Sequence, residues 1–149
     1  MSTRRTAERH QQGARREQGS ASIFVIGMSI VLLVCAGLVV DGGLAINARM
    51  RVADDAEQAA RVGADSINVE ELRATGTIVI DQAQAEQRAS GYLVARGYAP
   101  GQYSVAFGAN NSVVVDVQDT TDTTLLKLIN VDTYVVNGQA TAEPLTEAD

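Results

Sequence analysis

The stretch VCAGLVVDGGLAINARMR, residues 34–51, joins an uncharged apolar run to a charged segment. Before Asp41, the run from Ser20 to Val40 contains no charged residue. As a helix with about 1.5 Å rise per residue it would be roughly 31 Å long, close to the ~30 Å hydrocarbon core of a bilayer. We therefore expect a transmembrane helix over residues 20–40. Asp41 follows it at the headgroup level, where we expect its carboxylate to be hydrated.

Small residues recur at spacings of three and four after this exit, which is typical of one face of an α-helix. Such a face buries little area but lets another helix or a sheet approach closely. We therefore expect an amphipathic helix over residues 41–66 with an interaction face; an ordinary surface helix of the head domain is the alternative. Gly42 and Gly43 cost about 1 kcal/mol each inside a helix, so continuity with the membrane helix stays open. The predicted face consists of Ala45, Ala48, Val52, Ala56, Ala59 and Gly63.

Removal of the apolar run as a secretory signal is the competing interpretation. Cys35-Ala36-Gly37 weakly imitates a small-x-small cleavage site. The run is nevertheless longer than the roughly 7 to 15 apolar residues of a signal peptide, which favours a retained anchor. Cys35 is the only cysteine, so it excludes an intrachain disulfide, and we expect it to pack within the span.

Charge is unevenly distributed along the chain, whose formal net charge is -6. Residues 1–19 hold five Arg and two Glu, and the remainder is strongly acidic. Basic residues before the span and acidic ones after it predict a cytoplasmic N-terminus and an exported head. The tail has almost no apolar content, so we expect it to be disordered. Without aromatic residues beside the arginines, we expect no nucleic-acid binding.

The remaining sequence predicts a small α+β head. Asp81 looks like the N-cap of a helix over residues 82–96. Period-two alternation predicts strands at 103–107, 112–117 and 134–143, hence an antiparallel sheet of about three strands. A short helix over 125–129 is expected between the last two, capped by Asp122 or Thr123. The predicted organisation is a tail (1–19), a transmembrane helix (20–40), a juxtamembrane helix (41–66), an extracytoplasmic head (67–143) and a flexible C-terminal tail (144–149).

Catalytic and metal-binding motifs are absent from the sequence: there is no H-E-x-x-H, P-loop, G-x-S-x-G or C-x-x-C. The only histidine, His10, lies in the basic tail, so the head lacks the commonest general base. Asp116, Asp119 and Asp122 are spaced by three, unlike a calcium loop. We interpret them as solvated turn carboxylates, with a weak divalent site as the alternative. The sequence thus predicts no enzyme, no catalytic residue, no metal and no cofactor.

The segment VVDGGLAINARMRVADDAEQAARVGAD, residues 39–65, resembles the N-terminal region of TadE/TadG-like proteins of bacterial Flp (Tad) pilus assembly. The likeness extends over roughly residues 15–65. TTLLKLINVDTYVVNGQATAEP, residues 123–144, is similar to the end of actinobacterial-type members. The residues that fit the family pattern after the span are Asp41, Gly43, Arg49, Asp54, Asp55 and Ala64.

This resemblance implies a pseudopilin-like structural or assembly component, single-pass in the cytoplasmic membrane. The implied partners are the lipid bilayer and other membrane proteins of a pilus or secretion apparatus, in homo- or hetero-oligomers. It implies a membrane-exit motif of Asp41, Gly42, Gly43 and Arg49 and transfers no catalytic residues. The alternative function is a single-pass extracytoplasmic binding or sensor module unrelated to pili.

A prepilin-type peptidase site at Gly19-Ser20 is suitably placed but disfavoured. The pilin-like pattern has a Glu five residues after the cut, where this chain has Phe24. In a filament such a Glu is thought to pair with a neighbour's new N-terminal amine, and an unpaired buried amine is costly. The sequence therefore predicts an uncut, low-copy component rather than a shaft subunit.

Overall fold

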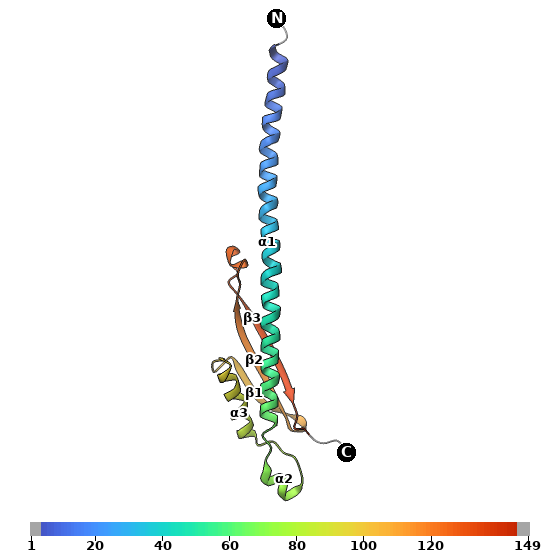
Figure 1. Cartoon of the computed structure of the whole chain (residues 1–149), viewed down its shortest axis with the longest axis vertical. Helices are drawn as coiled ribbons and strands as arrows, with labels where there is room; N and C mark the ends of the chain where they lie inside the picture. Colours follow the sequence, from blue (N-terminus) through green and yellow to red (C-terminus); the bar gives the residue numbers. More distant parts are fainter. Residues whose placement is uncertain (1–3, 146–149) are drawn as a thin grey trace.

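One long helix stands beside a small antiparallel sheet (Figure 1). The computed structural model describes residues 4–145, with side chains described from residue 21 onward. Helix α1 (Arg4–Ala64) extends far beyond the head, whose sheet and helix α3 (Gln82–Ala95) lie along its lower half. Helix α2 (Val69–Thr75) lies below the lower end of α1. This arrangement confirms the predicted α+β fold with a long N-terminal helix.

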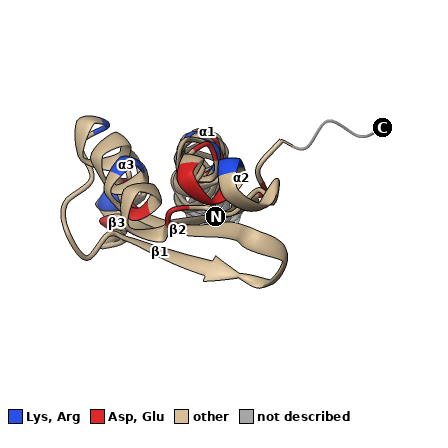
Figure 2. Cartoon of the chain, turned by 90° about the horizontal axis from the view of Figure 1, so that it is seen from below, with Lys and Arg blue, Asp and Glu red and all other residues tan. Residues whose placement is uncertain are grey.

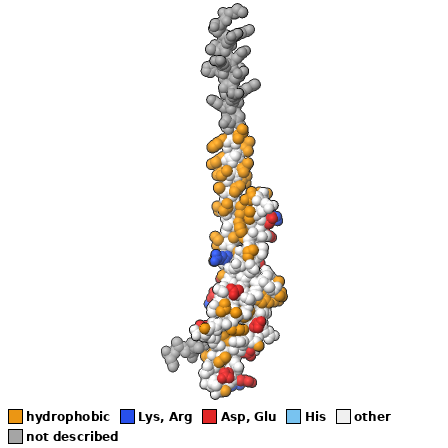
Figure 3. Space-filling view, turned by 180° about the vertical axis from the view of Figure 1, so that it is seen from behind, with side chains coloured by type: hydrophobic (Ala, Val, Ile, Leu, Met, Phe, Trp, Pro, Cys, Tyr) orange, Lys and Arg blue, Asp and Glu red, His pale blue; other side chains and the backbone are white. Residues whose placement is uncertain are grey.

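Helix α1 runs without interruption across Gly42 and Gly43, so the two predicted helices are one. Its upper part from Ala21 is long and apolar enough to cross a membrane. Apolar side chains cover this part, and charged ones gather lower down (Figure 3). The helix begins at Arg4, inside the segment predicted to be disordered; the side chains of residues 1–20 lie outside the described part of the chain.

The sheet has three strands in the order β1-β2-β3, all antiparallel: β1 (Tyr103–Gly108), β2 (Ser112–Asp122) and β3 (Thr133–Ala142). In the register, Val115 of β2 pairs with Val105 and with Ala140. Strand β2 is longer than predicted. The carboxylates of Asp116, Asp119 and Asp122 therefore lie on a strand, and their interpretation as turn residues was wrong.

Helix caps explain where the shorter elements begin and end. The Asp81 carboxylate accepts a hydrogen bond from the Gln84 N–H at 3.1 Å, which confirms the predicted cap of α3. Helix α2 lies in a segment for which the sequence patterns above predicted no helix or strand. Asn68 caps its start, and Gly76 ends it in the left-handed conformation, which favours glycine. Two 3-10 turns, η1 (Ala109–Asn111) and η2 (Leu126–Ile129), precede β2 and β3.

The core lies between the sheet and the two helices α1 and α3, which cover the same face of the sheet (Figure 2). The lower half of α1 is therefore the central element of the head rather than a separate juxtamembrane segment. Most of the predicted interaction face points into this core. Ala48, Val52, Ala56 and Ala59 are at most 3% exposed, Gly63 is buried and Ala45 is half-buried.

These small residues let other elements approach α1 closely, and the elements that do so are the chain's own sheet and α3. In this structure the predicted interaction face therefore packs within the chain itself. The physical reason is that an alanine face accepts any backbone that can approach it, and β2 and β3 are tethered nearby.

Candidate functional site

The Asp41 carboxylate joins the anchor helix to the connection between β2 and β3. Its Oδ1 accepts hydrogen bonds from the backbone N–H groups of Thr124 (2.8 Å) and Leu125 (3.2 Å). Its Oδ2 accepts from Leu125 (2.9 Å) and Leu126 (2.6 Å). The side chain is fully buried by these contacts. We call this arrangement the upper clamp.

The upper clamp supplies hydrogen-bond acceptors to the backbone N–H groups at the start of the η2 turn. The first N–H groups of a helical turn have no partner within it and need an outside acceptor. Asp122 or Thr123 was expected to supply it, and this prediction was wrong. Thr123 instead donates its hydroxyl to the carbonyls of Val131 and Asp132. Asp41 is also not hydrated as expected, because three backbone donors replace water around it.

A second buried carboxylate lies lower on the same helix. Asp55 is 3% exposed; its Oδ1 accepts from the Arg96 guanidinium at 2.7 Å and its Oδ2 from the Tyr98 hydroxyl at 2.9 Å. We call this the lower clamp, because Arg96 and Tyr98 directly follow α3. Its side-chain hydrogen bond to Asp55 raises the pKa of Arg96. Burial, followed by the Asp55 hydrogen bond, raises the pKa of Tyr98 to about 12.

The two clamps were detectable in part from the sequence. Asp41 and Asp55 belong to the same row of three- and four-residue spacings as the small face, so both carboxylates point toward the sheet. A buried carboxylate needs a partner. The identity of those partners could not be read from the helix itself.

Two glycines let backbones approach along this row. A Cβ on Gly63 would lie 3.1 Å from Val113 Cγ1 on β2, and one on Gly138 would lie 2.8 Å from backbone atoms of Ala53. The sheet therefore packs closely on the helix in two places: β3 contacts it between the clamps at Ala53, and β2 contacts it beyond the lower clamp at Gly63. Gly42 and Gly43, in contrast, have open space where a Cβ would stand.

Arg49, the remaining residue of the predicted membrane-exit motif, lies apart from the clamps. It is exposed, and no hydrogen bond or ion pair of its side chain occurs within the described part of the chain. Asp54 is exposed as well. Arg49 lines a groove between α1 and the edge strand β3 with Ala45, Ile46, Tyr134, Val135, Val136 and Asn137.

The hydrogen bonds of the two clamps hold elements of the fold together. Across the described residues, no three His, Cys, Asp or Glu side chains come together as a candidate metal site. Both buried carboxylates are saturated by donors of the protein itself. The predicted processing position, Gly19-Ser20, lies outside the residues whose side chains are described.

The structure combines an α+β head with an apolar helix that fits a single-pass membrane anchor. The lower part of the same helix packs in the core of the head. Residues 19–66 match the family model described as Putative Flp pilus-assembly TadE/G-like. This match confirms the resemblance of this segment to TadE/TadG-like proteins. Together with the helix that fits a membrane anchor, it supports a pilus-related membrane component. The matched segment contains the apolar run and both clamp carboxylates. No curated protein and no solved structure matches the chain.

Proposed function

We propose that the protein is a structural or assembly component of a Flp (Tad) type pilus or a related secretion apparatus. In this proposal α1 anchors it in the cytoplasmic membrane with the N-terminus inside and the head outside. It works by positioning protein surfaces and performs no catalysis. The family match over residues 19–66 supports the assignment to pilus assembly.

The observation that carries the proposal is the union of anchor and head in one helix. The upper clamp fixes the β2–β3 connection to α1 at Asp41, and the lower clamp fixes the end of α3 to it at Asp55. The core packs on the same helix from Ala48 to Ala64. A displacement of the anchor is therefore passed to the head without a flexible linker. This suits a component that transmits position between membrane-embedded and external parts of a machine.

The groove around Arg49 is the surface we propose for a partner protein of that machine. Its guanidinium has no partner in the described chain, and it lies beside Ile46 and Val135, which are 64% and 59% exposed. The adjacent strand β3 is at the edge of the sheet. A cation bordered by apolar side chains matches a partner surface that carries a carboxylate among apolar residues.

Co-purification from detergent-solubilised membranes tests the function. The full chain and an Arg49→Glu variant are isolated under the same conditions, and bound proteins are identified by mass spectrometry. Arg88→Glu, at an exposed position of α3, is the matched control with the same charge change. We expect the wild type and the control to retain pilus-assembly membrane proteins, and Arg49→Glu to lose them.

Two results would count against the proposal. Isolation of the wild type with none of the pilus-assembly proteins produced by the same cells would contradict the function itself. Equal retention by Arg49→Glu and Arg88→Glu would leave the function standing but remove Arg49 from the interface. A reporter that is active only outside the cytoplasm, fused after Asp149, tests the orientation and should be active.

A further inference from the structure

The β2–β3 loop, residues 123–132, rises along α1 beyond the rest of the sheet (Figure 1). It contains η2 and presents apolar side chains outward instead of burying them. Leu128 is 82% exposed, Ile129 52% and Val131 38%. A loop of a head bathed only in water would not be expected to expose such a contiguous group of apolar side chains.

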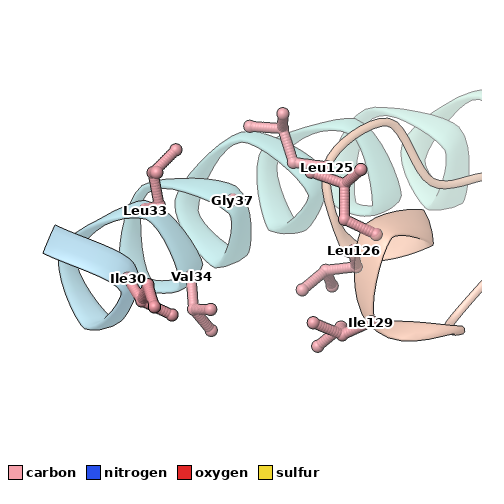
Figure 4. A pocket seen from close by; sticks show the side chains of 8 residues that line it. Ile30, Leu33, Val34, Gly37, Leu125, Leu126 and Ile129 are labelled. Carbon is pink, nitrogen blue, oxygen red and sulfur yellow. The ribbon is translucent and has the colours of Figure 1, made fainter. Parts of the chain in front are cut away.

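The loop and the anchor helix together line a partly open apolar cavity of about 210 Å³. Figure 4 shows Val34 of the helix and Ile129 of the loop pointing into the same space from opposite sides. For scale, an apolar cavity of about 150 Å³ can hold a benzene molecule. The lining residues are Ile30, Leu33, Val34, Gly37, Leu125, Leu126, Leu128 and Ile129.

Half of this lining belongs to the uncharged run that fits the membrane. Gly37 lies about 6 Å and Val34 about 10 Å along the helix from Asp41, toward the membrane. Leu125 packs on Gly37 so closely that a Cβ there would be 3.1 Å from the Leu125 Cβ. The loop is therefore held beside the end of the span, at the depth that interfacial elements reach, about 5–10 Å into the headgroup and acyl boundary.

We propose that the β2–β3 loop inserts into the leaflet on the head side of the membrane and that a lipid acyl chain occupies this cavity. The cavity continues the lipid-facing surface of α1, so its occupant has the chemistry of the surrounding bilayer. The inference goes beyond the pilus function and requires only that α1 spans a membrane.

Backbone N–H groups of the β2–β3 loop have hydrogen-bond partners within the protein, as insertion into a membrane requires. Non-helical backbone at membrane depth is tolerated only when its hydrogen bonds are satisfied within the protein. Asp41 takes the N–H groups of residues 124–126, and the N–H groups of residues 128, 130 and 131 donate to loop carbonyls. Lys127, the chain's only lysine, can extend its ammonium to the headgroups while its stem stays in apolar surroundings.

Tryptophan fluorescence tests the insertion, because the chain contains no Trp of its own. Full-length Leu128→Trp is reconstituted in phosphatidylcholine vesicles, with and without lipids brominated on their acyl chains. Val69→Trp is the aqueous control, since Val69 is 50% exposed on α2 at the far end of the head (Figure 1). Leu32→Trp, 57% exposed on the span, is the membrane control.

We expect brominated lipid to quench Leu128→Trp several-fold more strongly than Val69→Trp, and acrylamide to quench it less. If Leu32→Trp is quenched by brominated lipid and Leu128→Trp behaves like Val69→Trp, loop insertion is wrong while the anchor stands. If Leu128→Trp is shielded from both quenchers, a protein surface covers the loop and the lipid proposal is wrong. If Leu32→Trp also escapes brominated lipid, the membrane anchor and the insertion both fail.

Discussion

Gly138 of β3 lies directly against the backbone of Ala53 on α1, where a Cβ on residue 138 would be 2.8 Å from the Ala53 Cα and N. A helix backbone cannot move aside as the end of a flexible side chain can. We therefore expect Gly138→Ala to push β3 away from α1 and destabilise the head by about 1–3 kcal/mol, as overpacking does. Thermal unfolding followed by circular dichroism in detergent measures the change.

Gly43→Ala is the matched control for that substitution. Residue 43 has open space around a Cβ and lies inside a helix, so alanine should be neutral or stabilising by up to about 1 kcal/mol. Similar unfolding temperatures for Gly138→Ala and the wild type would show that the sheet does not approach α1 as closely as described.

Asp41→Asn should release the β2–β3 loop from α1. An amide has only one acceptor oxygen and would turn its NH₂ group toward backbone donors that now meet a carboxylate. Hydrogen exchange of the full chain in micelles should show faster exchange of the amides of residues 124–126. Asp54→Asn, on an exposed face of the same helix, should leave those amides protected. Unchanged protection in Asp41→Asn would argue against the upper clamp.

Ala56→Leu tests whether the small-residue face of α1 packs in the head's own core or contacts another molecule. Because Ala56 is fully buried in the head's own core, a leucine there should lower the free energy of unfolding by about 1–3 kcal/mol. Gln58→Leu, exposed two residues away, should have little effect. A variant that unfolds like the wild type but loses its co-purifying proteins would place the face between molecules instead.

Tyr98 should give the head a distinct alkaline response. Its pKa is about 12 in the folded chain against an ordinary value of 10.0. The folded state thus holds this proton more tightly than the unfolded state. Its contribution to stability is complete below about pH 10 and is lost as the pH rises toward 12. Ultraviolet titration of tyrosinate should show one late-ionising tyrosine, absent in Tyr98→Phe and present in Tyr134→Phe. A late step that persists in Tyr98→Phe would contradict this assignment.

Intact-mass measurement of the membrane-extracted protein tests the predicted absence of processing. Phe24 cannot pair with a new amine at Ser20, so we expect a chain that retains residues 1–19. A mass that lacks these residues, or major-subunit abundance in purified filaments, would contradict the argument from Phe24.

Local patterns in the sequence sufficed for most elements of this fold. The cap at Asp81 and the alternation in β1 and β3 depend on neighbours within a few residues, and the structure confirms them. Helix α2 was missed although Asn68 and Glu71 have the spacing of a capping box. Its signal was present but was obscured by the mixed polarity around it.

The hydrogen-bond partners in the clamps could not be predicted from local sequence patterns. Asp41 binds residues 83 to 85 positions further along the chain, so no window of neighbouring residues includes both partners. The local candidates Asp122 and Thr123 were reasonable by spacing, yet a distant carboxylate caps the turn. In the same way, the spacing of the alanines predicted a face that another helix or a sheet can approach closely, but it did not determine which element does so.

The position of the clamps on α1 also restricts how the length of this helix can change. Asp55 follows Asp41 by about four helical turns, so both carboxylates share one angular phase. One extra residue between them would rotate the upper half by about 100° and raise it by about 1.5 Å. The loop and the end of α3 could then no longer both be reached. The number of residues between Asp41 and Asp55 is thus fixed by the two clamps, and this segment should tolerate substitutions better than insertions or deletions. Above the cavity, in contrast, an added turn would only alter how deeply the anchor extends.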